Sequence, residues 1–222
     1  MTDTALQALR RNSIFQSIDE TSMEEFARLS RSRDYQKGEF LCLQGDAWPY
    51  LFIIAHGIIK AHKESEEGRN LLVTTFYPGE IFWGLAFFEE QASMPVRLEA
   101  HESSRVYLWD RSQCLPLFLK HGALSWGICR LMVQRMLYAS DIVEGLAFQP
   151  VASRLARLLL EEYPPDHLST ERHLTLDEMA ARIGSTREMV CRILYRFATQ
   201  GAIQINRTEF IFKDRQLLEK QA

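Results

Sequence analysis

The spacing of hydrophobic and polar positions changes along the chain. Near the amino terminus apolar residues recur at helical spacing, which predicts one or two short helices within residues 1–40. From Tyr35 to Leu115, short β-prone runs are separated by single glycines at roughly ten-residue intervals. These glycines are Gly38, Gly45, Gly57, Gly68 and Gly79. This pattern of short strands and glycine turns predicts a small antiparallel barrel or roll, with residues 66–70 as the turn of one hairpin.

A long helix is predicted from His121 to Phe148. One apolar stripe on it steps by three and four residues, the heptad spacing of a seam between two helices. It consists of Cys129, Met132, Met136, Ala139, Val143 and Leu146. A second stripe suits packing against the roll and contains Ile128, Leu131, Tyr138 and Ile142. Two apolar faces favour a dimer helix over a core helix inside one domain, and Pro150 ends the helix.

The strongest pattern lies in residues 174–200. Thr175 and Glu178 have the capping-box spacing of a helix start, and Ser185 and Glu188 repeat that spacing. Two short helices joined by a turn that contains a glycine predict a helix-turn-helix unit.

Polar side chains occupy the outward positions at the start of the second helix. They are Arg187, Glu188, Cys191 and Arg192. This part of such a helix reaches base edges in the major groove, where arginine bonds guanine and glutamate accepts from cytosine. The wider set expected to contact DNA is Thr175, Ser185, Thr186, Arg187, Glu188, Cys191, Arg192 and Arg196. The alternative is that Glu188 only caps the helix and that the arginines are solvated surface charges.

Composition and charge narrow the class of protein. The 222 residues are 46% hydrophobic and 25% charged, which is typical of a globular chain of one or two domains. The net charge of −3 divides into −4 for residues 1–150 (15 Lys+Arg against 19 Asp+Glu) and +1 for residues 151–222 (11 against 10). The net charge of the whole chain therefore conceals the opposite signs of the net charges of its two parts.

The residue types in the chain and their spacing exclude several kinds of site. The cysteines Cys42, Cys114, Cys129 and Cys191 form no CxxC pair, so we expect reduced thiols and no metal site. No apolar stretch approaches about 20 residues, and the amino terminus lacks a secretory signal, so a cytoplasmic protein without membrane contact is expected. No nucleophile–base arrangement or Gly-rich phosphate loop supports an enzyme.

Over essentially its whole length the chain resembles the Crp/Fnr (cyclic-AMP receptor protein) family of bacterial transcription regulators. Four stretches carry most of the resemblance. They are residues 78–80 (PGE) with residues 87–90 (FFEE) in the roll, residues 141–148 (DIVEGLAF) in the long helix, and residues 185–192 (STREMVCR).

The resemblance implies a two-fold dimer that reads an inverted repeat in double-stranded DNA. It places Arg187, Glu188 and Arg192 on the family's base-reading positions, which implies TGTGA-like half-sites. RNA polymerase would be a further partner if the protein is an activator.

The family's nucleotide cassette is not preserved. Its ribose-binding glutamate falls on Gly84, and its phosphate-binding Arg-Ser pair falls on Met94-Pro95. A buried phosphate requires a guanidinium, which methionine cannot supply. Of two helix residues that contact the base in the family, one falls on Ala139 and only Ser140 persists. The resemblance therefore implies an effector other than cyclic AMP, or no small ligand.

A candidate effector pocket remains. It comprises Phe82, Trp83, Gly84, Leu85, Met94, Pro95, Arg97 and Ser140. Its side chains suit haem or another apolar ligand, with an iron ligand drawn from His56, His62, His101 and His121, or they fill the roll and close it. The family's oxygen sensors carry an amino-terminal cysteine cluster, whereas the first cysteine here is Cys42, which speaks against an iron–sulfur cluster. A redox switch at Cys191 also stays open.

Together these patterns predict an α+β protein in three parts. Residues 1–120 form a cyclic-nucleotide-binding-like antiparallel β-roll with amino-terminal helices, residues 121–149 a dimerisation helix and hinge, and residues 150–222 a winged helix-turn-helix domain. Its wing is a hairpin predicted over residues 202–212, around Asn206-Arg207. The function expected is that of a homodimeric, sequence-specific DNA-binding transcription regulator. The alternative is a ligand- or haem-sensing module that acts through a protein partner.

Overall fold

A computed structural model describes residues 4–163, 169–171, 173–206 and 209–222. The chain divides into two compact units. One comprises residues 1–63 and 73–138, and the other comprises residues 64–72 and 139–222. Arg207, at the tip of the predicted wing, lies outside the described residues.

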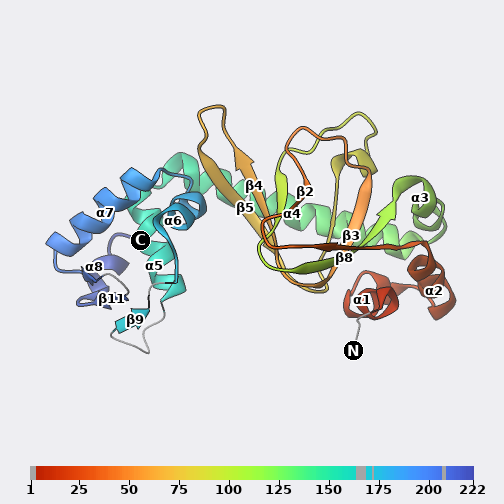
Figure 1. Ribbon diagram of the computed structural model, residues 1–222, viewed down its shortest axis with the longest axis horizontal. Coiled ribbons are helices and arrows are strands. Elements are labelled where there is room, and N and C mark those ends of the chain that lie inside the picture. The colour runs from red at the N-terminus through yellow and green to blue at the C-terminus, as the bar shows by residue number, and fades with distance from the viewer. Residues whose placement is uncertain (1–3, 164–168, 172, 207–208) are drawn as a thin grey trace. The chain divides into compact units, whose positions relative to one another are not determined.

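The first unit is built around two four-stranded sheets (Figure 1). One sheet has the order β1-β8-β3-β6 and the other the order β2-β7-β4-β5. The strands are β1 (Arg31–Tyr35), β2 (Phe40–Cys42), β3 (Tyr50–His56), β4 (Ile59–Glu64), β5 (Asn70–Phe76), β6 (Ile81–Trp83), β7 (Arg97–Ala100) and β8 (Ser104–Asp110). Neighbouring strands such as β3 and β8 pair antiparallel, so the predicted roll is confirmed.

Glycines set the turns of this roll. The five glycines that separate the predicted strands all have positive φ angles, between +77° and +94°. At Gly57 a side chain is also excluded, because its Cβ would lie 2.6 Å from Ser104 Cα. The predicted turn at residues 66–70 is confirmed, since the Ser65 N–H donates to the Arg69 carbonyl at 2.9 Å.

Short helices close one end of the roll (Figure 1). They are α1 (Ala5–Arg11), the 3-10 turns η1 (Phe15–Ser17) and η2 (Leu85–Phe87), α2 (Glu20–Leu29) and α3 (Arg111–Lys120). Their core is aromatic: the fully buried Trp109 donates its Nε1–H to the Phe26 carbonyl at 2.7 Å. Helix α3 is absent from the sequence prediction, because Pro116 in its middle obscures the helical pattern.

The predicted long helix is confirmed as α4 (Gly122–Phe148). Of its second stripe, Ile128 is buried and Leu131 packs against the core of the first unit, whereas Tyr138 is half exposed. Met132 packs against the same core and is only partly buried, so at least part of its side chain serves the contact with the roll. Its place in the dimer seam remains a prediction.

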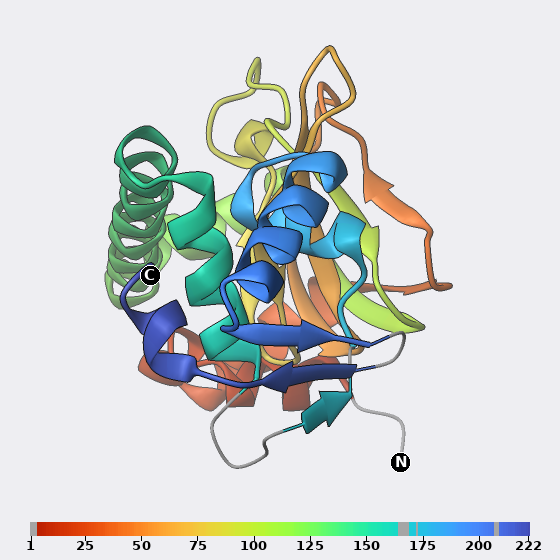
Figure 2. The same ribbon diagram turned by 90° about the vertical axis from the view of Figure 1, so that its left-hand side faces the viewer.

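Among its described residues, the second unit contains four further helices and a three-stranded sheet. The helices are α5 (Val151–Glu162), α6 (Leu176–Ile183), α7 (Arg187–Thr199) and α8 (Arg215–Glu219), and the strands are β9 (Ser169–Glu171), β10 (Ile203–Ile205) and β11 (Glu209–Phe212). The hairpin of β10 and β11 confirms the predicted wing, and Figure 2 shows it running below α7. Strand β9 pairs with β11 and was not foreseen in the sequence.

One arginine joins the end of α4 to the helix-turn-helix. The Arg154 guanidinium donates from Nη1 to the carbonyls of Gly145 and Gln149 at 3.1 and 2.7 Å, and from Nε to the Ile183 carbonyl at 2.8 Å. Burial lowers the pKa of Arg154. These bonds supply donors to carbonyls at the ends of α4 and α6, of which that of Gly145 also accepts from the Gln149 N–H at 3.1 Å. They fix the end of α4 against the end of α6.

Candidate nucleic-acid interface

Helix α6 begins and ends at the residues that the pattern predicts. Thr175 caps it: the Thr175 Oγ1 accepts from the Glu178 N–H at 3.1 Å, and the Glu178 carboxylate accepts from the Thr175 N–H at 3.0 Å. Gly184 ends it with a left-handed φ of +61°. A side chain here would place Cβ 2.5 Å from the Leu146 side chain. One side of Leu146 therefore lies against this turn, while the residue stays 39% exposed, and its place in the dimer seam remains a prediction.

Helix α7 is capped one residue later than predicted. Thr186, not Ser185, is the cap, and its Oγ1 accepts from the Met189 N–H at 3.3 Å. Ser185 is half-buried in the turn, where its N–H donates to the Ala180 carbonyl at 2.9 Å. Within the described part of the chain the Glu188 carboxylate bonds no backbone N–H and no cation. The interpretation of Glu188 as a helix cap is therefore wrong. Its carboxylate can accept a hydrogen bond from a partner outside the chain.

The two sides of α7 differ completely in exposure. The inner side chains are buried: Val190, Ile193, Leu194 and Phe197. The outer side chains are exposed: Arg187, Glu188, Cys191, Arg192, Tyr195 and Arg196. Five of these six were predicted from the sequence. Tyr195, 71% exposed, was missed because an aromatic residue in a helix is ordinarily assigned to the core.

An ion pair lies at the amino-terminal end of α7. Arg187 Nη1 lies 3.1 Å from Asp177 Oδ2, with the two side chains 65% and 69% exposed. A pair this exposed is weak, so Arg187 can exchange it for a base or a phosphate. We therefore expect Asp177 to compete with DNA for Arg187.

We expect Asp177→Asn to tighten DNA binding by up to about fivefold, because the substitution releases Arg187 at the cost of an exposed ion pair. Fluorescence anisotropy with labelled duplex at fixed salt measures this change. The control is Glu219→Gln, which removes the same charge from an exposed position in α8. Equal gains in the two variants would show that only net charge matters and that the ion pair does not compete.

A second charge cluster fixes α5 against α6. Glu162 accepts from Arg182 and lies 3.1 Å from His173 Nε2. Burial favours a raised pKa for the Glu162 carboxyl, but the bonds from His173 and Arg182 outweigh burial and lower it. Glu162 is therefore a carboxylate that holds the first helix of the helix-turn-helix in place.

The predicted effector pocket does not assemble as one site. Along β6, Trp83 packs into the core beneath the short helices, whereas Phe82 packs with Met94 into the interior of the roll. Adjacent residues of a strand point to opposite faces, which separates them. Leu85 and Pro95 are exposed, and the Arg97 guanidinium lies 6.0 Å from the Phe40 ring centroid.

The interior of the roll is filled with aromatic side chains. The Phe52 ring centroid lies 5.4 Å from that of Trp48, 6.2 Å from that of Phe76 and 5.7 Å from that of Phe82. Gly84 leaves no room for a side chain, because its Cβ would lie 1.7 Å from the Trp48 carbonyl oxygen. This packing favours a closed roll over an open apolar pocket.

Two of the four cysteines have unreactive thiols because they are buried. Cys42 and Cys114 are buried, and burial raises the pKa of each thiol to about 12. Cys129 and Cys191 are exposed, and Cys191 lies on the outer side of α7 as predicted. Among the described residues no group of three or more His, Cys, Asp or Glu side chains is arranged to hold a metal ion.

An exposed apolar stripe runs along α4. Its members step by three and four residues and form what we call the α4 apolar face. They are the apolar residues Trp126, Cys129, Val133, Met136 and Val143, with the polar Ser140 in the same register. Trp126, Val133, Met136 and Val143 are 68%, 51%, 65% and 64% exposed. Trp126 and Val133 were missed in the sequence, since Met132 offers an equally regular heptad. The exposed Ala139 flanks the face.

Comparisons with known proteins agree with both units. A model described as "Cyclic nucleotide-binding domain" matches residues 32–121, and one described as "Crp-like helix-turn-helix domain" matches residues 153–221. No described helix has the length and apolar character needed to cross a membrane.

Curated relatives and solved structures extend this similarity along the chain. A "CRP-like cAMP-activated global transcriptional regulator" of Mycobacterium tuberculosis is 23% identical, over 97% of this chain and 99% of its own. The "cAMP-activated global transcriptional regulator Vfr" of Pseudomonas aeruginosa is 26% identical, over 82% and 90%. A regulator of the crp/fnr family from Eubacterium rectale has a TM-score of 0.77 at 18% identity, over 96% and 98%. The chain belongs to the Crp/Fnr family of DNA-binding transcription regulators.

Proposed function

We propose that the protein is a homodimer that reads an inverted repeat of TGTGA-like half-sites. The observation that carries the proposal is the outer face of α7, where Arg187, Glu188 and Arg192 are exposed and Glu188 has no capping role. Two arginines and a free carboxylate supply the donors for guanine and the acceptor for cytosine that such a half-site presents.

The α4 apolar face supports the dimer. Four of its apolar side chains are each more than half exposed, which is unusual for a helix that faces water. Its spacing of three and four residues matches knobs-into-holes packing between two copies of α4. A two-fold dimer matches the symmetry of an inverted repeat and presents two α7 helices to half-sites about 34 Å apart.

The proposal is tested with a labelled duplex that carries two TGTGA half-sites as an inverted repeat. Fluorescence anisotropy at about 0.15 M salt should show binding at least about a thousandfold tighter than to a shuffled duplex. Because the carboxy-terminal part carries a net charge of only +1, non-specific binding should be weak. Equal affinity for both duplexes would refute sequence-specific reading.

Cyclic AMP does not fit the roll as a controlling ligand. Met94 is 1% exposed and packs in the core at the position of the family's arginine, and Gly84 has no space for a glutamate. We therefore propose control by a different effector or by none. The exposed polar face of α7 favours DNA reading over a module that acts only through a protein partner.

We expect isothermal titration with cyclic AMP to give no saturable binding up to about 1 mM. The physical reason is that the buried Met94 stands at the position of the family's arginine, and a thioether cannot neutralise the cyclic phosphate. Micromolar affinity for cyclic AMP would contradict the structure of the roll described above.

A further inference from the structure

The outer side of α7 carries an aromatic residue in line with Glu188. Tyr195 follows Glu188 by seven residues within the same helix. Because an α-helix turns by about 100° per residue, seven residues bring Tyr195 to within about 20° of the direction of Glu188. The rise of about 1.5 Å per residue places Tyr195 about 10.5 Å further along the helix axis. The two side chains therefore lie one behind the other on the same side of α7.

The Tyr195 side chain is directed away from the core of the second unit. It is 71% exposed, whereas Phe197, two residues later and about 200° around the helix, is fully buried. Among the described residues that follow Phe148, Tyr195 is the only large hydrophobic side chain that is exposed. The apolar core of this unit forms without it. Packing within the chain therefore does not account for an aromatic residue at this position.

Four exposed residues share this side of α7 at intervals of three and four residues. They are Glu188, Cys191, Arg192 and Tyr195. The same spacing, with contacts at the first, fourth, fifth and eighth residues, occurs in homeodomain recognition helices that lie in the major groove. Helix α7 continues to Thr199, so it remains helical past Tyr195. A helix docked in this way brings Tyr195 beside base pairs further along the groove than those that Glu188 meets.

The chemistry of the side chain selects its partner in the groove. Each base pair presents hydrogen-bonding atoms in the major groove, and thymine adds an apolar group, its 5-methyl group. The arginines of α7 match guanine and the Glu188 carboxylate matches cytosine, whereas the phenol ring of Tyr195 presents an apolar face. Phosphates border the groove, so a side chain at the centre of the outer side of α7 faces the bases. A ring at this place is complementary to a thymine methyl group.

We propose that Tyr195 reads a thymine in or next to each half-site, with its ring against the thymine 5-methyl group. The thymine lies at a base pair other than those read by the two arginines and Glu188. This inference rests on the proposed function, because it requires α7 to lie in the major groove. It makes Tyr195 a further specificity-determining residue of the regulator.

Replacement of thymine by deoxyuridine tests the proposal, because it removes the methyl group and keeps the hydrogen-bonding atoms of the base. The duplex is the inverted repeat of TGTGA half-sites, with thymine placed on either strand over about three flanking base pairs, the span of about 10.5 Å at about 3.4 Å per base pair. Each thymine is replaced in turn, in both half-sites together.

Fluorescence anisotropy with the full chain should reveal a position at which deoxyuridine weakens binding by wild type at least about fourfold, the effect of one buried methyl group. At that position Tyr195→Ala should bind the thymine and deoxyuridine duplexes alike. Tyr195→Ala should also bind the thymine duplex more weakly than wild type does.

Two variants separate the ring from other roles of Tyr195. Tyr195→Phe keeps the ring without the hydroxyl and should retain the preference for thymine. Tyr77→Ala removes the same side chain from a position of the first unit that is 54% exposed, and it should leave both affinity and preference unchanged. Circular dichroism of each variant verifies that it is folded.

Three results overturn the proposal. They are equal binding of thymine and deoxyuridine duplexes by wild type at every position, a thymine preference that survives in Tyr195→Ala at every position, and a preference lost in Tyr195→Phe. The second result would assign the methyl contact to another side chain, and the third would assign the role to the hydroxyl.

A shuffled duplex distinguishes this inference from the proposed function. If wild type binds the inverted repeat and the shuffled duplex alike, both the proposed function and this inference fail. If wild type prefers the inverted repeat but no thymine depends on Tyr195, only this inference fails.

Discussion

The double variant Val133→Glu, Met136→Glu should be a monomer at micromolar concentration and should bind an inverted repeat about a hundred- to a thousandfold more weakly. Both side chains lie on the α4 apolar face and are more than half exposed in the single chain. In a two-fold dimer each glutamate would face its own copy, so the substitution adds like-charge repulsion and removes apolar contact. A monomer then loses the simultaneous engagement of two half-sites.

Analytical ultracentrifugation measures the first effect and anisotropy the second. Leu119→Glu is the matched control, because it places the same charge on an apolar side chain of α3 that is 78% exposed and outside the α4 apolar face. Thermal unfolding should be nearly unchanged in both proteins, since exposed substitutions usually alter stability by less than about 0.5 kcal/mol. A variant that stays dimeric would place the dimer contact elsewhere.

Glu188→Ala should abolish base preference at one position of each half-site while leaving non-specific affinity nearly intact. The Glu188 carboxylate is exposed at the start of α7 and has no structural partner in the described part of the chain. A lost carboxylate–cytosine contact is worth about 1–3 kcal/mol of discrimination, or about ten- to a hundredfold in affinity ratio at each half-site.

The measurement compares duplexes in which that one base pair is changed to each alternative. Wild type should discriminate among the duplexes, and Glu188→Ala should bind them alike. Glu219→Ala corrects for the removed charge, because Glu219 is exposed in α8 of the same unit. A uniform loss of affinity for every duplex would mean that Glu188 supports α7 and reads nothing.

The helix-turn-helix was predictable because its signals are local. The cap at Thr175, the turn at Gly184 and the apolar spacing of α7 each depend only on residues a few positions away in the chain. Each lies where the pattern places it. The cap of α7 was displaced by one residue, since Ser185 and Thr186 are both good caps and the left-handed Gly184 decides between them.

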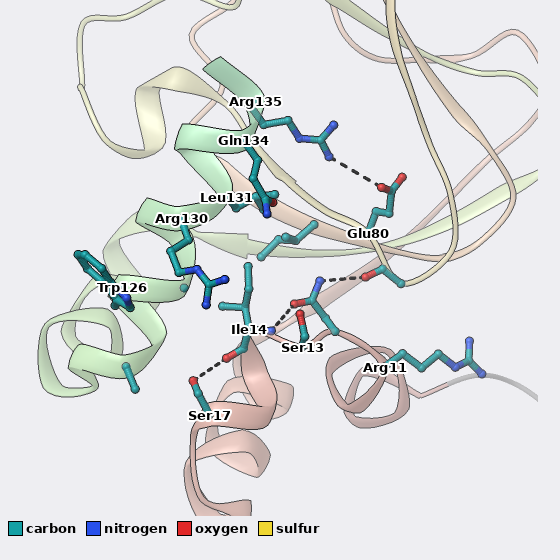
Figure 3. A pocket seen from close by; sticks show the side chains of 15 residues that line it. Arg11, Ser13, Ile14, Ser17, Glu80, Trp126, Arg130, Leu131, Gln134 and Arg135 are labelled. Atoms are coloured by element: carbon teal, nitrogen blue, oxygen red, sulfur yellow. Dashed lines mark hydrogen bonds and ion pairs between the residues drawn. The ribbon is translucent and has the colours of Figure 1, made fainter. Parts of the chain in front are cut away.

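The packing of the β-roll and of α4 was less predictable, because it depends on contacts between residues far apart in the chain. Whether Met132 or Val133 faces a partner depends on which side of α4 the roll covers, and the two are neighbours in a run of apolar residues. Likewise, Phe82 and Trp83 lie next to each other in sequence but belong to two different cores. A hollow beside α4 (Figure 3) is also lined by segments far apart in the chain, around Ile14, Glu80 and Arg130, which no spacing rule connects.

Selection of binding sites from random-sequence DNA by the full-length protein tests the central claim most directly. The protein should enrich an inverted repeat of two TGTGA-like half-sites whose centres lie about one helical turn apart. Repeating the selection with Glu188→Ala should erase one base preference in each half-site and keep the spacing. Enrichment of single half-sites, of unrelated sequences or of no sequence at all would contradict the reading of DNA by a two-fold pair of α7 helices.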